Sequence, residues 1–162
     1  MKFKNPLLVV SDLEKSKTFY KEILGLRIIM DFGANVTLTG GIALQTKETW
    51  LEFIQAENEE IIWGNKATEL YFEEDDFNSF IQKLNSFSHI DYVHPPIEHR
   101  WGQRVVRLYD PDKHIIEIGE NLKSVCQRFL NNGLTKDEIA IRMDIPLKMV
   151  NKLLKEKIPS VS

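Results

Sequence analysis

The sequence predicts an α+β fold made of two successive βαβββ modules and a small C-terminal extension of three helices. Residues 1–47 and 66–120 each show a strand pattern, an amphipathic helix and three further strand patterns, in the same order. After residue 120 only helical spacing is found. We therefore expect a two-module domain over residues 1–120 and a helical extension over residues 121–162.

The first module begins with a short apolar strand at residues 5–10, which a helix follows. Ser11 and Glu14 have the spacing of a capping box, so we expect the helix to begin there. Gly25 supplies the left-handed residue that ends it. Three short strands separated by glycine or asparagine turns complete the module.

The second module repeats this order with different polar residues. Leu70 and Phe72 alternate with polar neighbours over residues 69–74, which predicts a strand with one apolar and one polar face. A helix begun by Asp75 or Asp76 follows. Three more strands complete the module.

The sequence also allows predictions for three segments that connect the strands and helices. The acidic segment 48–66 is interpreted as a linker in preference to a flap over a cavity. In the Asp-Pro-Asp turn at 110–112 the next position commonly needs a positive φ, which glycine adopts most easily. Because Lys113 stands there, we expect the turn to be slightly strained or of another type. His94 and His99 lie in a proline-rich segment and are expected to be loop histidines rather than metal ligands.

The extension consists of three short amphipathic helices. An Asn-Asn-Gly stop ends the first, and Thr135 with Glu138 forms a capping box for the second. Residues 132–154 resemble a helix-turn-helix segment. Its recognition helix would present four polar side chains: Lys148, Asn151, Lys152 and Lys155. The same apolar stripes would also suit a helical cap packed on a sheet or on a second subunit, so DNA binding is an alternative rather than the first expectation.

Composition and charge narrow the class of protein. The net charge of −3 favours neither a general nucleic-acid binder nor an acidic solvating chain. The charge is uneven, because residues 123–162 carry +4 and residues 1–122 therefore carry −7. The lone Cys126 excludes an internal disulfide. No stretch is apolar for long enough to span a membrane or has the form of a signal peptide, so we expect a soluble cytoplasmic protein.

A family resemblance rests on two stretches, NPLLVVSDLEKSKTFYKEILGL at 5–26 and YDPDKHIIEIGE at 109–120. With the repeat around them, they resemble the vicinal-oxygen-chelate superfamily, which includes glyoxalase I, extradiol dioxygenases, fosfomycin-resistance enzymes and bleomycin-resistance proteins. The resemblance covers roughly residues 3–120. It implies that the two modules curl their sheets into a cup and that the protein forms a homodimer.

The resemblance also places four metal-ligand positions on the strands that line the cup. In this sequence they hold Asn5, Gln45, Glu69 and Glu117. The family's usual histidines are missing, so the set offers only oxygen donors with two negative charges. Glu69 and Glu117 could bind Mg²⁺, Mn²⁺ or Ca²⁺, and the expected cofactor is either none or a divalent metal ion.

Without a metal, the two carboxylates need other partners, because like charges in a cup repel. Arg104 and Arg107 lie on opposite sides of one predicted strand, so only one of them can face the cup. If one does, the cavity is a carboxylate–guanidinium site. If neither does, Glu69 and Glu117 form a protonated pair or a catalytic acid/base couple. Trp101, in a loop able to close over the cup, is the expected pocket aromatic.

Three functions follow as alternatives. The first is a glyoxalase-like or resistance-type protein that binds a small polar molecule without the usual metal. The second is a divalent-metal-dependent lyase, isomerase or dioxygenase. The third is a small-molecule-responsive regulator that binds DNA through residues 121–162. The sequence does not decide whether the protein is an enzyme, because a shared fold does not transfer chemistry.

Overall fold

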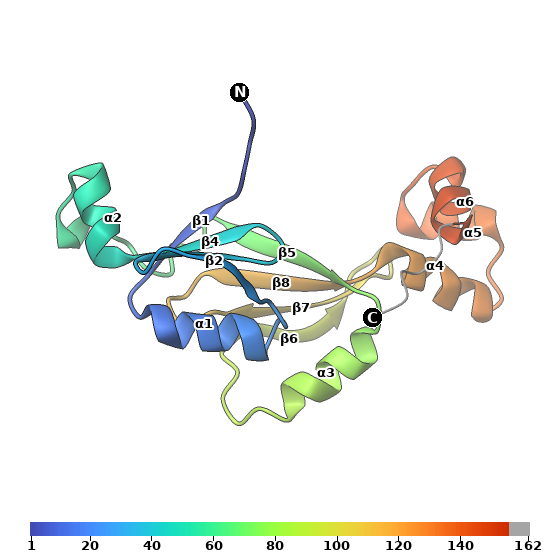
Figure 1. The fold of residues 1–162 in the computed structure, drawn as a ribbon. Coiled ribbons are helices and arrows are strands. Elements are labelled where there is room, and N and C mark those ends of the chain that lie inside the picture. Colours follow the sequence, from blue (N-terminus) through green and yellow to red (C-terminus); the bar gives the residue numbers. More distant parts are fainter. Residues whose placement is uncertain (156–162) are drawn as a thin grey trace. The chain divides into compact units, whose positions relative to one another are not determined.

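The computed structural model describes residues 1–155 and confirms the α+β fold of two βαβββ modules and three C-terminal helices (Figure 1). The chain forms two compact units. The first unit comprises residues 1–68 and 109–114, and the second comprises residues 69–108 and the chain from 115 onward. The helical extension therefore groups with the second module. In the described part of the chain, no helix is long and apolar enough to cross a membrane.

The first unit contains a four-stranded sheet in the order β1-β4-β3-β2. Strand β1 runs parallel to β4, whereas β3 pairs antiparallel with both β4 and β2. The elements are β1 (Leu7–Val10), α1 (Leu13–Glu22), β2 (Ile28–Asp31), β3 (Asn35–Leu38) and β4 (Ile42–Thr46). Gly25 has φ 70°, as its predicted role at the helix end requires.

The predicted capping box at Ser11 is wrong. Helix α1 begins after Asp12, whose carboxylate accepts a hydrogen bond from the Lys15 N–H at 3.0 Å. Ser11 is used elsewhere in the same unit, because its hydroxyl and its N–H both donate to the carboxylate of Asp112. This long-range pairing competes with local capping and could not be read from spacing alone.

The turn that contains Asp112 folds with the first unit for further reasons. Asp110 is buried and accepts a hydrogen bond from the hydroxyl of Tyr20 at 2.9 Å. The N–H of His114 donates to the same carboxylate at 2.8 Å. Lys113 has φ 68°, so of the two alternatives the turn is the one that puts a non-glycine residue in the left-handed region. The turn is therefore held from both sides despite the conformation that Lys113 must adopt.

The segment between the modules is a connection with its own secondary structure. It contains α2 (Lys47–Ile54) and the short helix η1 (Asn58–Glu60). Helix α2 ends at Gln55, which has φ 56° in a position where glycine is usual. Because no glycine marks the end of this helix, the sequence pattern indicated a linker and did not indicate α2.

The second unit contains a four-stranded sheet in the order β5-β8-β7-β6. Its elements are β5 (Glu69–Glu74), α3 (Phe77–Asn85), β6 (Tyr92–Glu98), β7 (Arg104–Tyr109) and β8 (Ile115–Glu120). Helix α3 begins at Asp76, one of the two predicted starts, and lies along one face of this sheet (Figure 1). The Arg104 guanidinium lies 5.1 Å from the centre of the Phe77 ring, so the even-numbered residues of β7 face α3.

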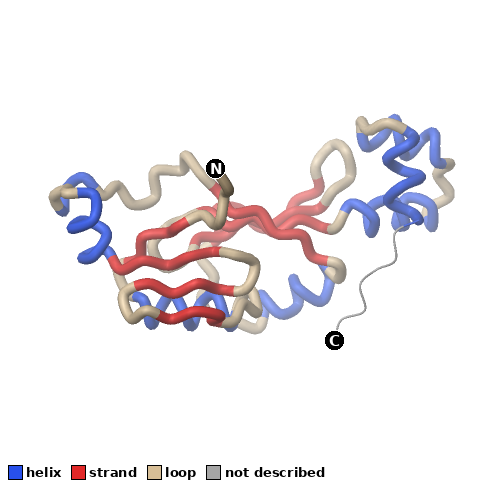
Figure 2. The backbone as a smooth tube through the Cα atoms, turned by 45° about the horizontal axis from the view of Figure 1, so that its top comes forward, coloured by secondary structure: helices blue, strands red, loops and turns tan. Residues whose placement is uncertain are grey.

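The extension forms a small core of its own within the second unit. Its helices are α4 (Leu122–Asn131), α5 (Lys136–Met143) and α6 (Leu147–Lys155), which gather at one end of the sheet (Figure 2). The predicted Thr135–Glu138 capping box is confirmed. The buried core residues are Val125, Cys126, Phe129, Ile139, Met143 and Val150.

Candidate functional site

Three charged side chains meet on one face of the second sheet. Arg107, from β7, donates from Nε to Glu69 Oε2 at 3.0 Å, and one of its terminal nitrogens contacts Glu117 Oε2. Glu117 is only 6% exposed, whereas the Glu69 side chain is 40% exposed. Arg107 therefore joins a buried carboxylate to one that solvent reaches.

Strand pairing places these residues on the same face. β5 and β8 run parallel, with Glu69 opposite Ile115 and Tyr71 opposite Glu117. Glu69 and Glu117 therefore lie on the same side of two neighbouring strands, displaced by one two-residue period. The flanking Ile116 and Ile118 point to the other side and are buried. Glu117 thus lies between two isoleucines because it occupies the polar face of the strand.

The guanidinium resolves the repulsion that two carboxylates would otherwise have. A guanidinium has donors pointing in several directions, so one Arg107 can serve Glu69 and Glu117 together. As predicted, the two arginines lie on opposite faces of β7. Arg107 contacts Glu69 and Glu117, and Arg104 bonds Glu120 on the other face. The arrangement is the carboxylate–guanidinium alternative, with Arg107 as the arginine that faces Glu69 and Glu117.

His94 is a member of this cluster that sequence reasoning missed. His94 lies on strand β6, where it pairs with Arg107 across the two antiparallel strands. Its Nε2 lies 3.2 Å from a terminal nitrogen of Arg107, which can only donate, so Nε2 is the acceptor in this contact. Burial, together with the positive charge of Arg107, lowers the pKa of His99, so the His99 ring favours the neutral form. Strand β6 has two register shifts against β7, which the proline-rich sequence did not indicate.

Trp101 belongs to a second polar network on this sheet. Its ring stacks on His99 with a centroid distance of 4.2 Å, and its Nε1 donates to Gln103 Oε1 at 3.2 Å. Gln103 is buried and donates to the hydroxyl of Tyr71 at 3.0 Å and to the backbone oxygen of Glu120 at 2.9 Å. Burial raises the pKa of Tyr71, so its hydroxyl is protonated at neutral pH. The indole is therefore packed and oriented.

Arg104 lies in a different cluster, on the face that α3 covers. It bonds both carboxylate oxygens of Glu120, at 3.0 and 2.8 Å, and Arg128 of α4 bonds the same group at 3.0 Å. Burial opposes ionisation of Glu120, but the bonds from Arg104 and Arg128 outweigh it and lower the pKa of Glu120.

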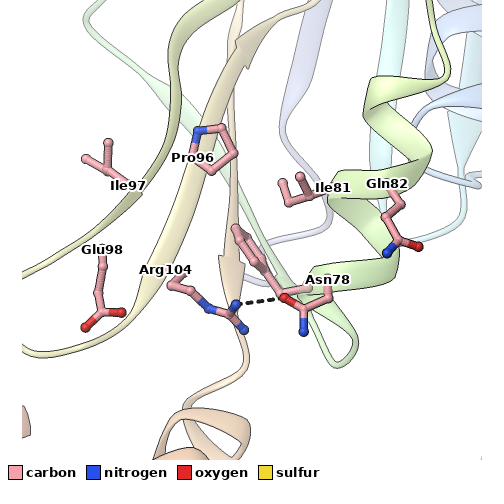
Figure 3. A pocket seen from close by; sticks show the side chains of 8 residues that line it. Asn78, Ile81, Gln82, Pro96, Ile97, Glu98 and Arg104 are labelled. Carbon is pink, nitrogen blue, oxygen red and sulfur yellow. Dashed lines mark hydrogen bonds between the residues drawn. The ribbon is translucent and has the colours of Figure 1, made fainter.

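Two hollows adjoin Arg104 on this face. One has a volume of about 470 Å³ and lies between α3 and β6, where Asn78 accepts a hydrogen bond from Arg104 at 2.8 Å (Figure 3). The other, of about 620 Å³, lies between α3 and α4 and includes Lys123 in its lining. Arg104 thus lines these hollows and is not a partner of Glu69 and Glu117.

The other two expected site residues lie in the first unit. Asn5 precedes β1, is half-buried, and donates to the backbone oxygen of Pro6 at 3.2 Å. Gln45 is 3% exposed, accepts a hydrogen bond from Asn35 at 2.8 Å and donates to Thr49. Both amide atoms of Gln45 are therefore used inside the first unit.

The strand registers show how the modules correspond. Asp12 and Asp76 begin the equivalent helices, so Val10 corresponds to Glu74, two residues before each start. Val10 pairs with Thr46, and Glu74 pairs with Glu120. On this register Asn5 does correspond to Glu69. The residue that corresponds to Glu117 is Ala43, whereas Gln45 corresponds to Gly119.

The donor set does not fit a metal centre. Within residues 1–155, no group of three or more His, Cys, Asp or Glu side chains is arranged to hold a metal ion. The two carboxylates of the second sheet already share Arg107, and a divalent cation there would meet a fixed positive charge. Glu69 and Glu117, as Arg107 holds them, are therefore not suited to a divalent cation.

The protein contains two βαβββ modules, and the sheet of the second module has a polar face. This is the architecture of the vicinal-oxygen-chelate superfamily. The family is then given by sequence comparison: the glyoxalase-like domain model matches residues 3–123. The chain belongs to this family. The match ends at the start of α4, so the extension lies almost entirely outside it. No curated protein matches the chain.

Solved structures support the same assignment. A protein of unknown function from Agrobacterium tumefaciens is 39% identical, with a TM-score of 0.67 over 75% of this chain and 94% of that one. A glyoxalase/bleomycin resistance protein/dioxygenase from Nocardioides has 18% identity and a TM-score of 0.61, over 74% and 83%. A glyoxalase-related enzyme from Fulvimarina pelagi has 19% identity and a TM-score of 0.63, over 75% and 90%. The last two show the fold alone.

Proposed function

We propose that this protein binds a small polar molecule with a cationic group on the sheet face that carries Glu69, Arg107 and Glu117. The single observation behind the proposal is the shared guanidinium, which holds a buried and a half-exposed carboxylate in fixed positions. Fixed polar groups with few internal degrees of freedom are what small-molecule sites use to orient a ligand.

The charge balance of this face favours a cationic ligand. Two carboxylates share one guanidinium, and His94 contributes only an acceptor nitrogen to Arg107. One negative charge is therefore left over, and its exposed end is Glu69. A ligand ammonium or guanidinium beside Glu69 would gain a charge-assisted hydrogen bond without breaking the buried Arg107–Glu117 pair. The −7 charge of residues 1–122 would also favour the approach of a cation.

The description of one structural neighbour suggests a first compound to test for binding. One neighbour is described as a glyoxalase/bleomycin resistance protein/dioxygenase, so bleomycin is a rational first probe. Agmatine, a small amine with a guanidinium group, tests the charge argument alone. Benzoate, an anion of similar size, is the matched negative probe.

Isothermal titration calorimetry of the full chain with each probe tests the proposal. We expect bleomycin or agmatine to bind, benzoate not to bind, and Glu69→Gln to weaken binding at least about tenfold, since a charge-assisted bond is lost. Glu22→Gln, which makes the same charge change on the exposed side of α1, should leave affinity within about twofold. Equal losses in the two variants, binding of benzoate alone, or binding that requires added Mn²⁺ would each contradict the proposal.

A further inference from the structure

Helices α5 and α6 form a helix-turn-helix pair. α5 ends at Met143, α6 begins at Leu147, and the short turn between them starts with Asp144 in the left-handed conformation, at φ 56°. The Asp144 N–H donates back to the carbonyl oxygens of α5. A turn of this length is the connection by which such pairs set one helix across the other.

Buried side chains fix the pair at the positions this geometry needs. Ile139 is fully buried and Met143 is 4% exposed on α5, and Val150 is fully buried on α6. Ile145 in the turn and Leu153 on α6 pack against the same core. The pair therefore shares a buried core and has a defined outer face, on which Ile141, Leu147 and Met149 are exposed beside the polar residues.

The outer face of α6 is basic. Lys148, Lys152 and Lys155 are exposed and follow one another at spacings of four and three residues, which places them on one side of the helix. Asn151 accepts a hydrogen bond from Lys136 of α5 at 3.2 Å, so a fourth cation adjoins this face. Helix α6, from Leu147 to Lys155, contains no acidic residue.

We propose that the extension binds duplex DNA, with α6 entering the major groove and its lysines contacting phosphates. The second helix of a helix-turn-helix pair is the one that reads DNA in this motif. The charge agrees, because residues 123–162 carry +4 in a chain of net −3. Of the acidic residues of the pair, Glu138 takes part in the capping box of α5 and Asp144 lies 3.8 Å from Arg100, while Asp137 is exposed in the first turn of α5.

The extension is fixed to the second module, so bound DNA would have a defined position relative to that sheet. Arg128 of α4 bonds Glu120 at the end of β8 and Glu98 at the end of β6. The Phe129 ring lies against Gly102, where an added Cβ would come within 2.1 Å of it. These contacts use α4 and leave α6 available.

Fluorescence anisotropy with a labelled random-sequence duplex of about thirty base pairs tests the proposal on the full chain, at 50 and at 200 mM salt. We expect binding at low salt that weakens at least about tenfold at high salt, because displaced counterions dominate the affinity. The triple variant Lys148→Gln, Lys152→Gln, Lys155→Gln should lose at least about tenfold in affinity and flatten the salt dependence by about two to three phosphate contacts.

The control is Lys4→Gln, Lys15→Gln, Lys21→Gln, which removes the same charge from exposed positions of the first module. It should stay within about twofold of the parent chain, since these residues lie outside the helix-turn-helix pair. Circular dichroism confirms that both variants are folded. Absence of duplex binding at 50 mM salt overturns the proposal. Equal losses of affinity in the two variants also overturn it. So does light scattering that gives the mass of two chains for the parent protein and of one chain for the triple variant of α6.

Discussion

The two modules share one topology and differ sharply in where they place charge. In the first, the positions that correspond to Glu69 and Glu117 hold Asn5 and Ala43, and the nearby Gln45 is held by neutral hydrogen bonds. In the second, the same positions hold carboxylates that share Arg107. The repeat has kept its helix starts and strand pairing, while among the described residues the carboxylate–guanidinium cluster is found in the second sheet. The fold and the site are therefore under separate physical constraints.

The largest expected effect comes from removing the cation of the second module. Arg107→Met leaves Glu117 buried without its partner, and the free energy of unfolding should fall by about 3–5 kcal/mol. Urea unfolding followed by circular dichroism measures it. The double variant Arg107→Met, Glu117→Leu should recover most of the loss, because a matched apolar pair replaces a matched charged one. No recovery would mean that Arg107 stabilises the module in some other way than through Glu117.

A second test concerns the extension, which only the second module carries. Gly102→Ala places a methyl group against the Phe129 ring and keeps φ at 88°, so unfolding should become easier by about 2–4 kcal/mol. Gly133→Ala is the matched control, with φ 90° and no atom within 4 Å of the added carbon. It should show the backbone cost alone, about 1–2 kcal/mol. Equal losses in thermal unfolding would contradict packing at Gly102.

The third test uses pH to separate charged from neutral contacts. Bonds from Arg104 and Arg128 hold the pKa of Glu120 below the ordinary value of 4.5. Its stabilisation is therefore fully present above pH 4.5 and is lost as the pH falls through the lowered, folded-state pKa. Glu120→Gln should be less stable than the parent by about 2 kcal/mol at pH 7, and the gap should close on acidification. A gap independent of pH would exclude the ionised carboxylate as its cause.

The smallest effect is expected in the first module. Gln45→Leu removes the acceptor of Asn35 and the donor to Thr49 while preserving apolar bulk, so about 1 kcal/mol should be lost. Because no charge is involved, this loss should be the same at pH 4 and pH 7 in urea unfolding. A loss as large as that of Arg107→Met would remove the distinction between the modules.

The sequence predicted the fold because its signals are local. Strand alternation, the caps at Asp76 and Thr135, and the left-handed Gly25 each depend on residues close in the chain. The prediction failed at Ser11, where a partner a hundred residues away takes the hydroxyl that local spacing had assigned to capping.

The candidate site was predictable in part for the same reason. Strand parity separated Arg104 from Arg107 correctly, since parity needs only the strand itself. It could not place His94 beside Arg107, because register shifts in β6 decide that contact. Nor could it align Gln45, because correspondence between modules follows from pairing with β1.

Strand β8 carries its two carboxylates three residues apart, on opposite faces, each matched to a different arginine. If β8 slipped by one residue against β5, Glu117 would turn toward α3 and Glu120 away from Arg104. Both carboxylates would then lose their guanidinium at once, and isoleucines would replace them on the polar side. The two carboxylates on opposite faces therefore fix the register of β8 against β5. An all-apolar strand in the same place would not have this constraint.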